Sequence, residues 1–74
     1  MNTMSRRKFA KLKAAMYEAE ITQPDLARAT GKSLAYICRR MNGHDVFDLE
    51  DVRKIGTLLH LDRAQWLDYF MEGA

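Results

Sequence analysis

Signals for starting and ending helices recur at short intervals along this chain, and they limit its fold more than any other feature. The residues that carry them cap helix N-termini or favour helix ends: Thr22 with Asp25, Gly31, Ser33, Asn42 with Gly43, Asp48 and Asp62. The segments between them are predicted to form five short helices, at about residues 5–20, 22–31, 33–42, 48–59 and 62–71. A chain of 74 residues closes only one hydrophobic core, so we predict a single all-α domain over residues 1–74.

The composition supports helices and points to a cytoplasmic protein. One proline, four glycines and 47% hydrophobic residues favour helices over strands. Cys38 is the only cysteine, so the chain has no internal disulfide, and no zinc-binding spacing is present. Glu18 and Glu20 interrupt the N-terminal segment before it reaches the length of a signal peptide or a membrane span. We predict no metal and no cofactor.

Charge is distributed unevenly along the chain. Residues 1–40 carry nine Lys or Arg against three acids, whereas residues 41–74 carry three Lys or Arg against seven acids, and the formal net charge is +2. A basic half in a small domain is typical of proteins that bind polyanions.

The helix predicted over residues 33–42 has one face that the core does not need. Helical spacing places four residues on a buried stripe: Leu34, Ile37, Cys38 and Met41. The opposite face is centred on Tyr36 and Arg39. Its flanks are Lys32, Ser33, Ala35, Arg40 and Asn42. Arg can donate two hydrogen bonds to guanine, and Ala or a Tyr ring can contact thymine methyl groups, so this face suits the DNA major groove.

The segment ITQPDLARATGKSLAYICRRMNG, residues 21–43, is similar to the helix-turn-helix of the phage repressor and Cro-like family of transcription regulators. The agreement lies in Thr-Gln at a helix start, Leu-Ala, Gly at the turn, Ile in the second helix and Asn-Gly after it. The following DLEDVRKIGTLLHLDRAQWL resembles the fourth and fifth helices of that family. The resemblance covers about residues 21–67 and implies a compact five-helix lambda repressor-like domain, with the helix-turn-helix at about residues 22–42.

The resemblance also implies roles for individual residues. Gln23 matches a position that bonds a DNA phosphate and braces the recognition helix, and Asn42 matches a phosphate contact. The positions that usually contact base edges are Ser33, Leu34, Ala35, Tyr36 and Arg39.

Two interpretations of the helix at residues 33–42 differ in its rotation. The helical wheel buries Leu34 and exposes Arg40, whereas the register of the family suggests the reverse. If the helical wheel is right, Arg40 joins the residues that contact bases, together with Lys32 at the positive end of the helix dipole. Tyr36 and Arg39 point outward in both interpretations.

Two further surfaces are expected to take part in binding. The basic residues Arg6, Arg7 and Lys8 either contact the DNA backbone from the first helix or form an arm that follows a groove. The helix at about residues 62–71 is apolar almost all the way round, so it has more apolar surface than one buried face needs. Its candidate dimer contacts are Trp66, Leu67, Phe70 and Met71.

The sequence therefore predicts a transcriptional regulator, acting as a homodimer on a palindromic double-stranded DNA operator and repressing transcription. Such a protein would work at the nucleoid of a bacterial or phage-infected cell. Two alternatives stay open: an antitoxin or controller protein that regulates its own operon, and a helical protein–protein adaptor. His44 and His60 have no catalytic partner at a recognisable spacing, and His60 is expected at a helix end, so no enzyme is predicted.

Overall fold

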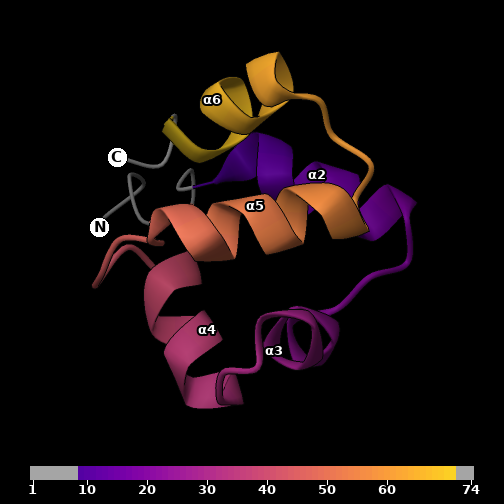
Figure 1. Cartoon of the computed structure of the whole chain (residues 1–74). Helices are drawn as coiled ribbons and strands as arrows, with labels where there is room; N and C mark the ends of the chain where they lie inside the picture. The colour runs from indigo at the N-terminus through magenta and orange to yellow at the C-terminus, as the bar shows by residue number, and fades with distance from the viewer. Residues whose placement is uncertain (1–8, 72–74) are drawn as a thin grey trace, which may run out of the picture.

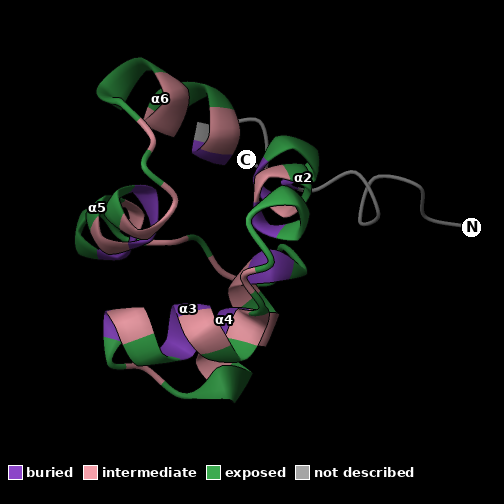
Figure 2. Cartoon of the chain, turned by 90° about the vertical axis from the view of Figure 1, so that its right-hand side faces the viewer, coloured by how far each residue is buried: buried purple, intermediate pink, exposed green. Residues whose placement is uncertain are grey.

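A computed structural model describes residues 9–71, which form five helices and no strands. The helices are α2 (Ala10–Glu18), α3 (Gln23–Thr30), α4 (Leu34–Met41), α5 (Leu49–Leu58) and α6 (Arg63–Met71). In Figure 1 helix α5 crosses between α6 above it and the pair α3 and α4 below it, and the view turned by 90° in Figure 2 shows α2 on the opposite side of the molecule from α5. The all-α prediction is confirmed for this part of the chain.

Four of the five predicted helix starts are observed as hydrogen-bonded caps. The first helix differs from its prediction, because α2 begins at Ala10, after a left-handed Phe9 that makes no side-chain cap. The hydroxyl of Thr22 accepts from the backbone N–H of Asp25, and the Asp25 carboxylate accepts from Thr22 in return, with Pro24 in the first turn of α3. Asp62 and Gln65 make the same reciprocal pair before α6, with both distances 2.9 Å. These caps satisfy N–H groups that a helix cannot satisfy itself, so local sequence sets where the capped helices begin.

Four helices of the described residues end at a residue with a left-handed backbone. These residues are Glu20 after α2, Gly31 after α3, Gly43 after α4 and His60 after α5, with φ angles of 58°, 74°, 83° and 59°. In the turn after α5, the N–H of His60 donates to Thr57 at 3.1 Å and the N–H of Leu61 donates to Gly56 at 2.8 Å. The expected place of His60 at a helix end is confirmed. His60 adopts this left-handed backbone although its Cβ atom makes the conformation unfavourable.

Replacing His60 with glycine should therefore stabilise the fold. We expect His60→Gly to raise the free energy of unfolding by about 0.5–1 kcal/mol, because glycine adopts this backbone without a steric penalty. Urea denaturation followed by circular dichroism measures the change. Thr57→Gly is the matched control within α5 and should destabilise by about 0.3–0.5 kcal/mol, since glycine is less favourable than threonine inside a helix. Equal effects of both variants would contradict this account.

The core is formed by the inner sides of all five helices. Its fully buried members include Leu12, Leu26, Ile37, Met41 and Ile55. Figure 2 shows the buried residues on the sides of the helices that face one another, and the exposed residues on the outer sides. The rings of Phe9, Phe47 and Phe70 pack edge to face, with centroids 5.5–6.4 Å apart.

Helical spacing in the sequence places Ala19, Leu34 and Leu49 on the buried sides of their helices, but all three are exposed in the structure. Ala19 is exposed because α2 ends at Glu18, short of the predicted residue 20. Leu49 is 79% exposed because it lies in the first turn of α5, where no other helix covers it. Leu34 is 47% exposed. In contrast, Asp51, which the helical pattern does not place inside, is only 1% exposed.

Candidate nucleic-acid interface

Helices α3 and α4 are joined by a turn of three residues. Gly31 has a left-handed backbone, with φ of 74°, and the N–H groups of Gly31 and Lys32 both donate to the carbonyl of Ala27, at 2.9 and 3.1 Å. This close turn makes the chain change direction sharply, so that Figure 1 views α3 nearly along its axis while α4 runs up and down the page. Ser33 then caps α4 by accepting from the N–H of Tyr36 at 3.0 Å.

The rotation of α4 agrees with the register implied by the resemblance at Leu34 and Arg40, and the helical wheel was wrong for Leu34, Cys38 and Arg40. Ile37 and Met41 are buried as predicted, but Leu34 is exposed and Cys38 is only half-buried. The side chain of Arg40 is 19% exposed, so it lies on the inner side. The wheel failed because it grouped residues by hydrophobicity, whereas the long stem of an arginine can cover apolar surface.

Tyr36 points inward, which corrects the prediction that it faces outward. Its hydroxyl donates to the buried carboxylate of Asp51 in α5. The ammonium of Lys32 lies 3.3 Å from the same carboxylate and 3.4 Å from the Tyr36 hydroxyl. The backbone N–H of Asp51 also donates to Asp48 at 2.8 Å, which caps α5. This cluster of Lys32, Tyr36 and Asp51 ties the start of α4 to α5.

The cluster shifts the ionisation of its members in the directions that keep Asp51 charged. Burial alone raises the pKa of Asp51, but hydrogen bonds from Tyr36 and Lys32 outweigh it, so the pKa of Asp51 lies below its ordinary value. The hydrogen bond to Asp51 and burial raise the pKa of Tyr36. Hydrogen bonds with Tyr36 and Asp51 raise the pKa of Lys32. The arrangement is therefore a carboxylate–ammonium pair bridged by a neutral phenol.

Arg40 supports the same inner side of α4. Its guanidinium carbon lies 3.4 Å from the centroid of the Tyr36 ring, a stacking contact between cation and aromatic face. A guanidinium nitrogen also lies 3.8 Å from the carboxylate of Asp45. Arg40 is thus placed to hold Tyr36 and the loop after α4, rather than to read bases as the helical wheel suggested.

The outer face of α4 carries side chains that the core does not use. Arg39 has 60% of its side chain exposed, and its Nε donates to Asp45 at 2.9 Å. The exposed residues of this face are Ser33, Leu34, Ala35, Arg39 and Asn42. Gln23 is half-buried at the start of α3, where its side-chain oxygen accepts from the thiol of Cys38 at 3.0 Å. Gln23 therefore connects α3 to α4 beside this outer face.

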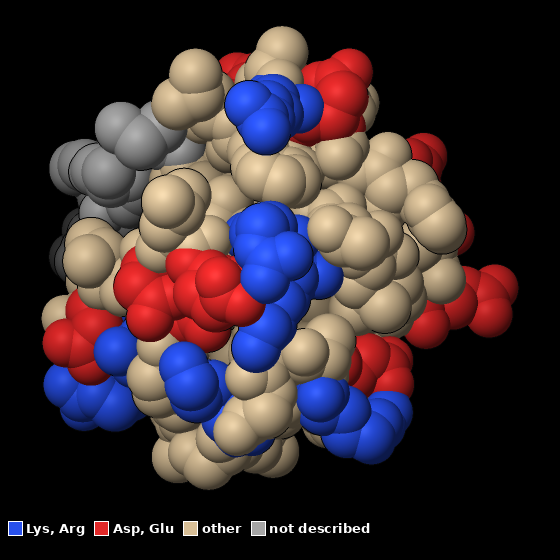
Figure 3. Space-filling view, in the orientation of Figure 1, with Lys and Arg blue, Asp and Glu red and all other residues tan. Residues whose placement is uncertain are grey.

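The two oppositely charged halves of the sequence lie against each other in the fold. Among residues 9–71, four ion pairs join a base of the first half to an acid of the second half: Lys11–Asp68, Lys32–Asp51, Arg39–Asp45 and Arg40–Asp45. Figure 3 shows Lys and Arg side chains beside Asp and Glu side chains over the same face, rather than a continuous basic surface. The excess of basic residues in the first half of the sequence therefore does not produce a continuous basic surface on this face.

The candidate dimer residues occupy different environments. Leu67 is 65% exposed and Trp66 is half-buried, whereas Phe70 is 7% exposed and belongs to the core. Phe70 is buried because its ring packs against Phe9 and Phe47. Met71 lies in α6, but its side chain is outside what the structure describes. Arg6, Arg7 and Lys8 lie outside the described residues.

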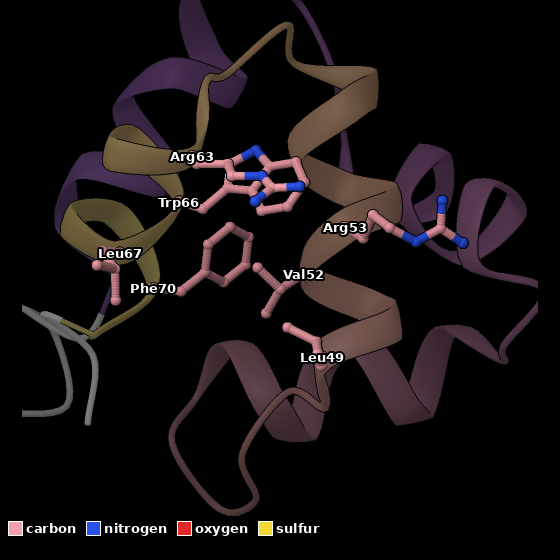
Figure 4. Close-up of a pocket in the computed structure, with 7 residues that line it drawn as sticks. All are labelled: Leu49, Val52, Arg53, Arg63, Trp66, Leu67 and Phe70. Carbon is pink, nitrogen blue, oxygen red and sulfur yellow. The ribbon is translucent and has the colours of Figure 1, made fainter.

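A groove between α5 and α6 accounts for part of the surplus apolar surface. It has a volume of about 550 Å³, and its apolar lining consists of Leu49, Val52, Trp66, Leu67 and Phe70. Arg53 and Arg63 contribute to its rim (Figure 4). Sequence analysis identified the α6 side of this surface but missed Leu49, which was assigned to the core.

Within residues 9–71, no helix is both long and apolar enough to cross a bilayer. Comparison with models of protein families, with characterised proteins and with solved structures finds no match for this chain. The resemblance noted in the sequence therefore stands on its residues and spacing alone. What the structure itself adds is a compact all-α arrangement of five helices over the described part of the chain.

Proposed function

We propose that this protein is a sequence-specific double-stranded DNA-binding regulator of transcription, built on a lambda repressor-like helix-turn-helix. The observation that carries the proposal is the outer face of α4. This short helix follows a three-residue turn after α3, and it exposes an arginine among small residues that have no role in the core. A helix presented in this way can enter the major groove while the helix before it crosses the DNA backbone.

The roles of the α4 residues follow from their positions. Arg39 is the main candidate for hydrogen bonds to a guanine, while the exposed Leu34 and Ala35 can contact thymine methyl groups. Ser33 and Asn42 lie at the two ends of the same face, where phosphates or base edges would be in reach. Gln23 is placed to brace α4 through Cys38. Tyr36, Lys32 and Arg40 act from behind the helix, by holding its orientation.

Specific recognition by so small a unit calls for two copies on one operator. A single recognition helix reads only a few base pairs, and a two-fold symmetric dimer doubles that number. The described part of the protein measures 33 × 26 × 23 Å, so two copies side by side can present α4 in half-sites about one DNA turn, 34 Å, apart. Such a dimer would repress transcription by blocking RNA polymerase.

Arg39→Ala should weaken binding to the preferred DNA sequence by about 10- to 100-fold, because a bidentate contact to guanine is worth about 1–3 kcal/mol. Fluorescence anisotropy with a duplex enriched by in vitro selection, and with a scrambled duplex, measures the loss. Arg28→Ala is the matched control: Arg28 is also exposed and ion-paired, but it lies on α3. An equal loss on both duplexes would show that Arg39 contacts phosphate and does not read a base.

Asp45→Asn is expected to strengthen DNA binding, whereas Arg39→Ala is expected to weaken it. The hydrogen bond from Arg39 lowers the pKa of Asp45, so this carboxylate is charged at neutral pH and holds the Arg39 side chain that DNA needs. Asp45→Asn removes a negative charge near the phosphates and frees Arg39, so binding should tighten about three- to tenfold at low salt. Unchanged or weaker binding at low salt would argue that Arg39 meets DNA in the orientation that Asp45 sets.

A further inference from the structure

The groove between α5 and α6 has an apolar floor that is already formed. Its volume is about 550 Å³, and Val52, Trp66 and Phe70 lie between its two helices (Figure 4). The indole of Trp66 is fixed, because its N–H donates to the carbonyl of Leu61 at 2.9 Å and Gly56, against which it packs, has no Cβ atom. A preformed apolar surface does not have to be ordered when a partner binds, so the cost of binding is low.

The edges of this groove project into solvent. Leu49 on α5 is 79% exposed, Leu67 on α6 is 65% exposed, and Val46 just before α5 is 74% exposed. A pocket for a small molecule encloses most of its ligand, whereas apolar side chains that point outward at an edge are covered only by a larger partner. On α6 the lining runs from Arg63 to Phe70, roughly 10 Å of helix, so the groove has room for about two turns of a bound helix.

The walls of the groove favour a helical partner over an extended one. Both walls are α-helices, whose backbone N–H and C=O groups are hydrogen-bonded within each helix. An extended segment would find no backbone partners there, whereas a helix satisfies its own backbone and needs only side-chain contacts. Helix-in-groove recognition of this kind uses apolar residues spaced i, i+3 or i+4 and i+7 along the bound helix.

The charged residues that line the groove, within the part of the chain that the structure describes, are both bases: Arg53 and Arg63. Figure 4 shows Arg63 beside Trp66 at one end. The guanidinium of Arg63 is exposed and forms no hydrogen bond or ion pair with any residue of 9–71. Arg53 pairs with Glu50 on the same helix, and exposed pairs of this kind contribute little, so Arg53 can exchange this partner for another carboxylate.

Other acids of α5 and α6 have partners elsewhere. Asp51 is buried in the cluster that ties α4 to α5. Asp68 of α6 pairs with Lys11 of α2 at 2.8 Å, and Asp62 caps the start of α6. The groove therefore presents an unneutralised positive charge, that of Arg63, directly beside apolar surface.

This charge selects a different protein over a second copy of the chain. In a two-fold contact each copy meets the same surface of the other, so the bases Arg53 and Arg63 would lie near the same two bases of the second copy. Like charges facing each other across an interface oppose binding. An apolar stripe flanked by Asp or Glu instead covers the floor and neutralises both arginines.

We propose that the α5–α6 groove binds an acidic amphipathic helix of another protein, with its apolar stripe on Trp66 and Phe70 and its carboxylates paired with Arg63 and Arg53. The inference goes beyond the proposed function and does not rest on it, because none of the residues that line the groove belongs to α4. It assigns to a protein partner the α6 surface that the sequence predicted as a dimer contact.

Two synthetic peptides test this recognition. Both have about 14 residues, enough to form a helix, and both carry the same leucine stripe and no tryptophan. One has Glu beside the stripe and the other has Lys. Anisotropy of the labelled peptides gives their dissociation constants for the full chain, and the emission of Trp66, the chain's one tryptophan, reports on the groove. The Glu peptide should bind about tenfold or more tightly than the Lys peptide at low salt, and it should shift the emission to shorter wavelength.

Three variants locate the binding. Arg63→Glu should weaken the Glu peptide about tenfold and strengthen the Lys peptide, and an acid in the first turn of α6 is compatible with the helix. Leu67→Ser should weaken both peptides about three- to tenfold, because it removes an exposed apolar edge. Arg28→Glu, on α3, changes the net charge as Arg63→Glu does and should leave both constants unchanged. Circular dichroism checks that each variant is folded.

Several results would overturn the inference. They are a Glu peptide that does not bind up to millimolar concentration, equal binding of the two peptides, binding that leaves the Trp66 emission unchanged, and an equal loss in Arg28→Glu and Arg63→Glu. Sedimentation equilibrium without peptide adds one more, since a dimer that Arg63→Glu strengthens or breaks would mean that a second copy occupies the groove. No DNA is present in these measurements, so failure of the DNA-reading role would leave their outcome unchanged.

Discussion

Replacing Asp51 with asparagine should lower the free energy of unfolding by about 2–3 kcal/mol, the range for losing hydrogen bonds to a buried charged group. The Asp51 side chain is 1% exposed and holds together Tyr36 of α4 and Lys32 of the preceding turn. Asn has nearly the same volume but no charge, so the packing is kept while the attraction for Lys32 is lost. Urea denaturation measures the change, and a cost under about 0.5 kcal/mol would contradict the proposed role of the cluster.

The pH dependence of the same variant gives an independent check. Because the pKa of Asp51 is lower in the folded than in the unfolded protein, its stabilisation is fully present above the ordinary aspartate pKa of 3.8. It is lost as the pH falls through the lower, folded-state value. The difference in stability between wild type and Asp51→Asn should therefore be constant near neutral pH and shrink below about pH 4. Tyr36→Phe, which removes one partner and keeps the carboxylate, should cost less than Asp51→Asn.

Gly56→Ala should destabilise the protein by about 1–3 kcal/mol, although alanine is normally favoured over glycine in a helix by about 1 kcal/mol. The indole of Trp66 packs directly on the backbone of α5 at Gly56, and its N–H donates to the carbonyl of Leu61 at 2.9 Å. A Cβ atom at residue 56 would lie 2.2 Å from that indole nitrogen. The ring must therefore move, and the hydrogen bond and the shape of the groove change with it.

The effect of Gly56→Ala should change sign when the indole is removed. In a Trp66→Leu background nothing rigid opposes the added methyl group, so Gly56→Ala should stabilise by up to about 1 kcal/mol through helix propensity. Thermal or urea unfolding of the four proteins completes the cycle, and near-UV circular dichroism follows the tryptophan. Destabilisation of the same size in both backgrounds would show that the clash with Trp66 is not the cause.

Local signals allowed the sequence to predict where the helices begin and end. The caps at Thr22, Ser33, Asp48 and Asp62 all form as expected, because each depends on residues no more than three positions apart. The ends at glycine were also predictable. A left-handed Glu20 was not, since glutamate does not favour that backbone, which the backbone hydrogen bonds from Glu20 to Tyr17 and from Ile21 to Met16 hold in place.

Long-range contacts determined what the sequence did not predict. The rotation of α4 depends on Tyr36 bonding Asp51, 15 residues away, and on Arg40 covering the Tyr36 ring. No periodicity in residues 33–42 contains that information. The basic first half likewise suggested a basic surface, but Asp45 and Asp68 of the second half pair with its side chains. Composition by halves cannot reveal which charges the fold brings together.

A selection of bound duplexes from a random pool, followed by sequencing, tests the DNA-reading role of α4 most directly. The account predicts an enriched palindromic motif with half-site centres about one helical turn, 34 Å, apart. It also predicts that Arg39→Ala changes the preference at one position of each half-site, whereas Arg28→Ala leaves the motif intact. Absence of any enriched motif at low salt would contradict the account, and the outer face of α4 would then serve a partner other than DNA.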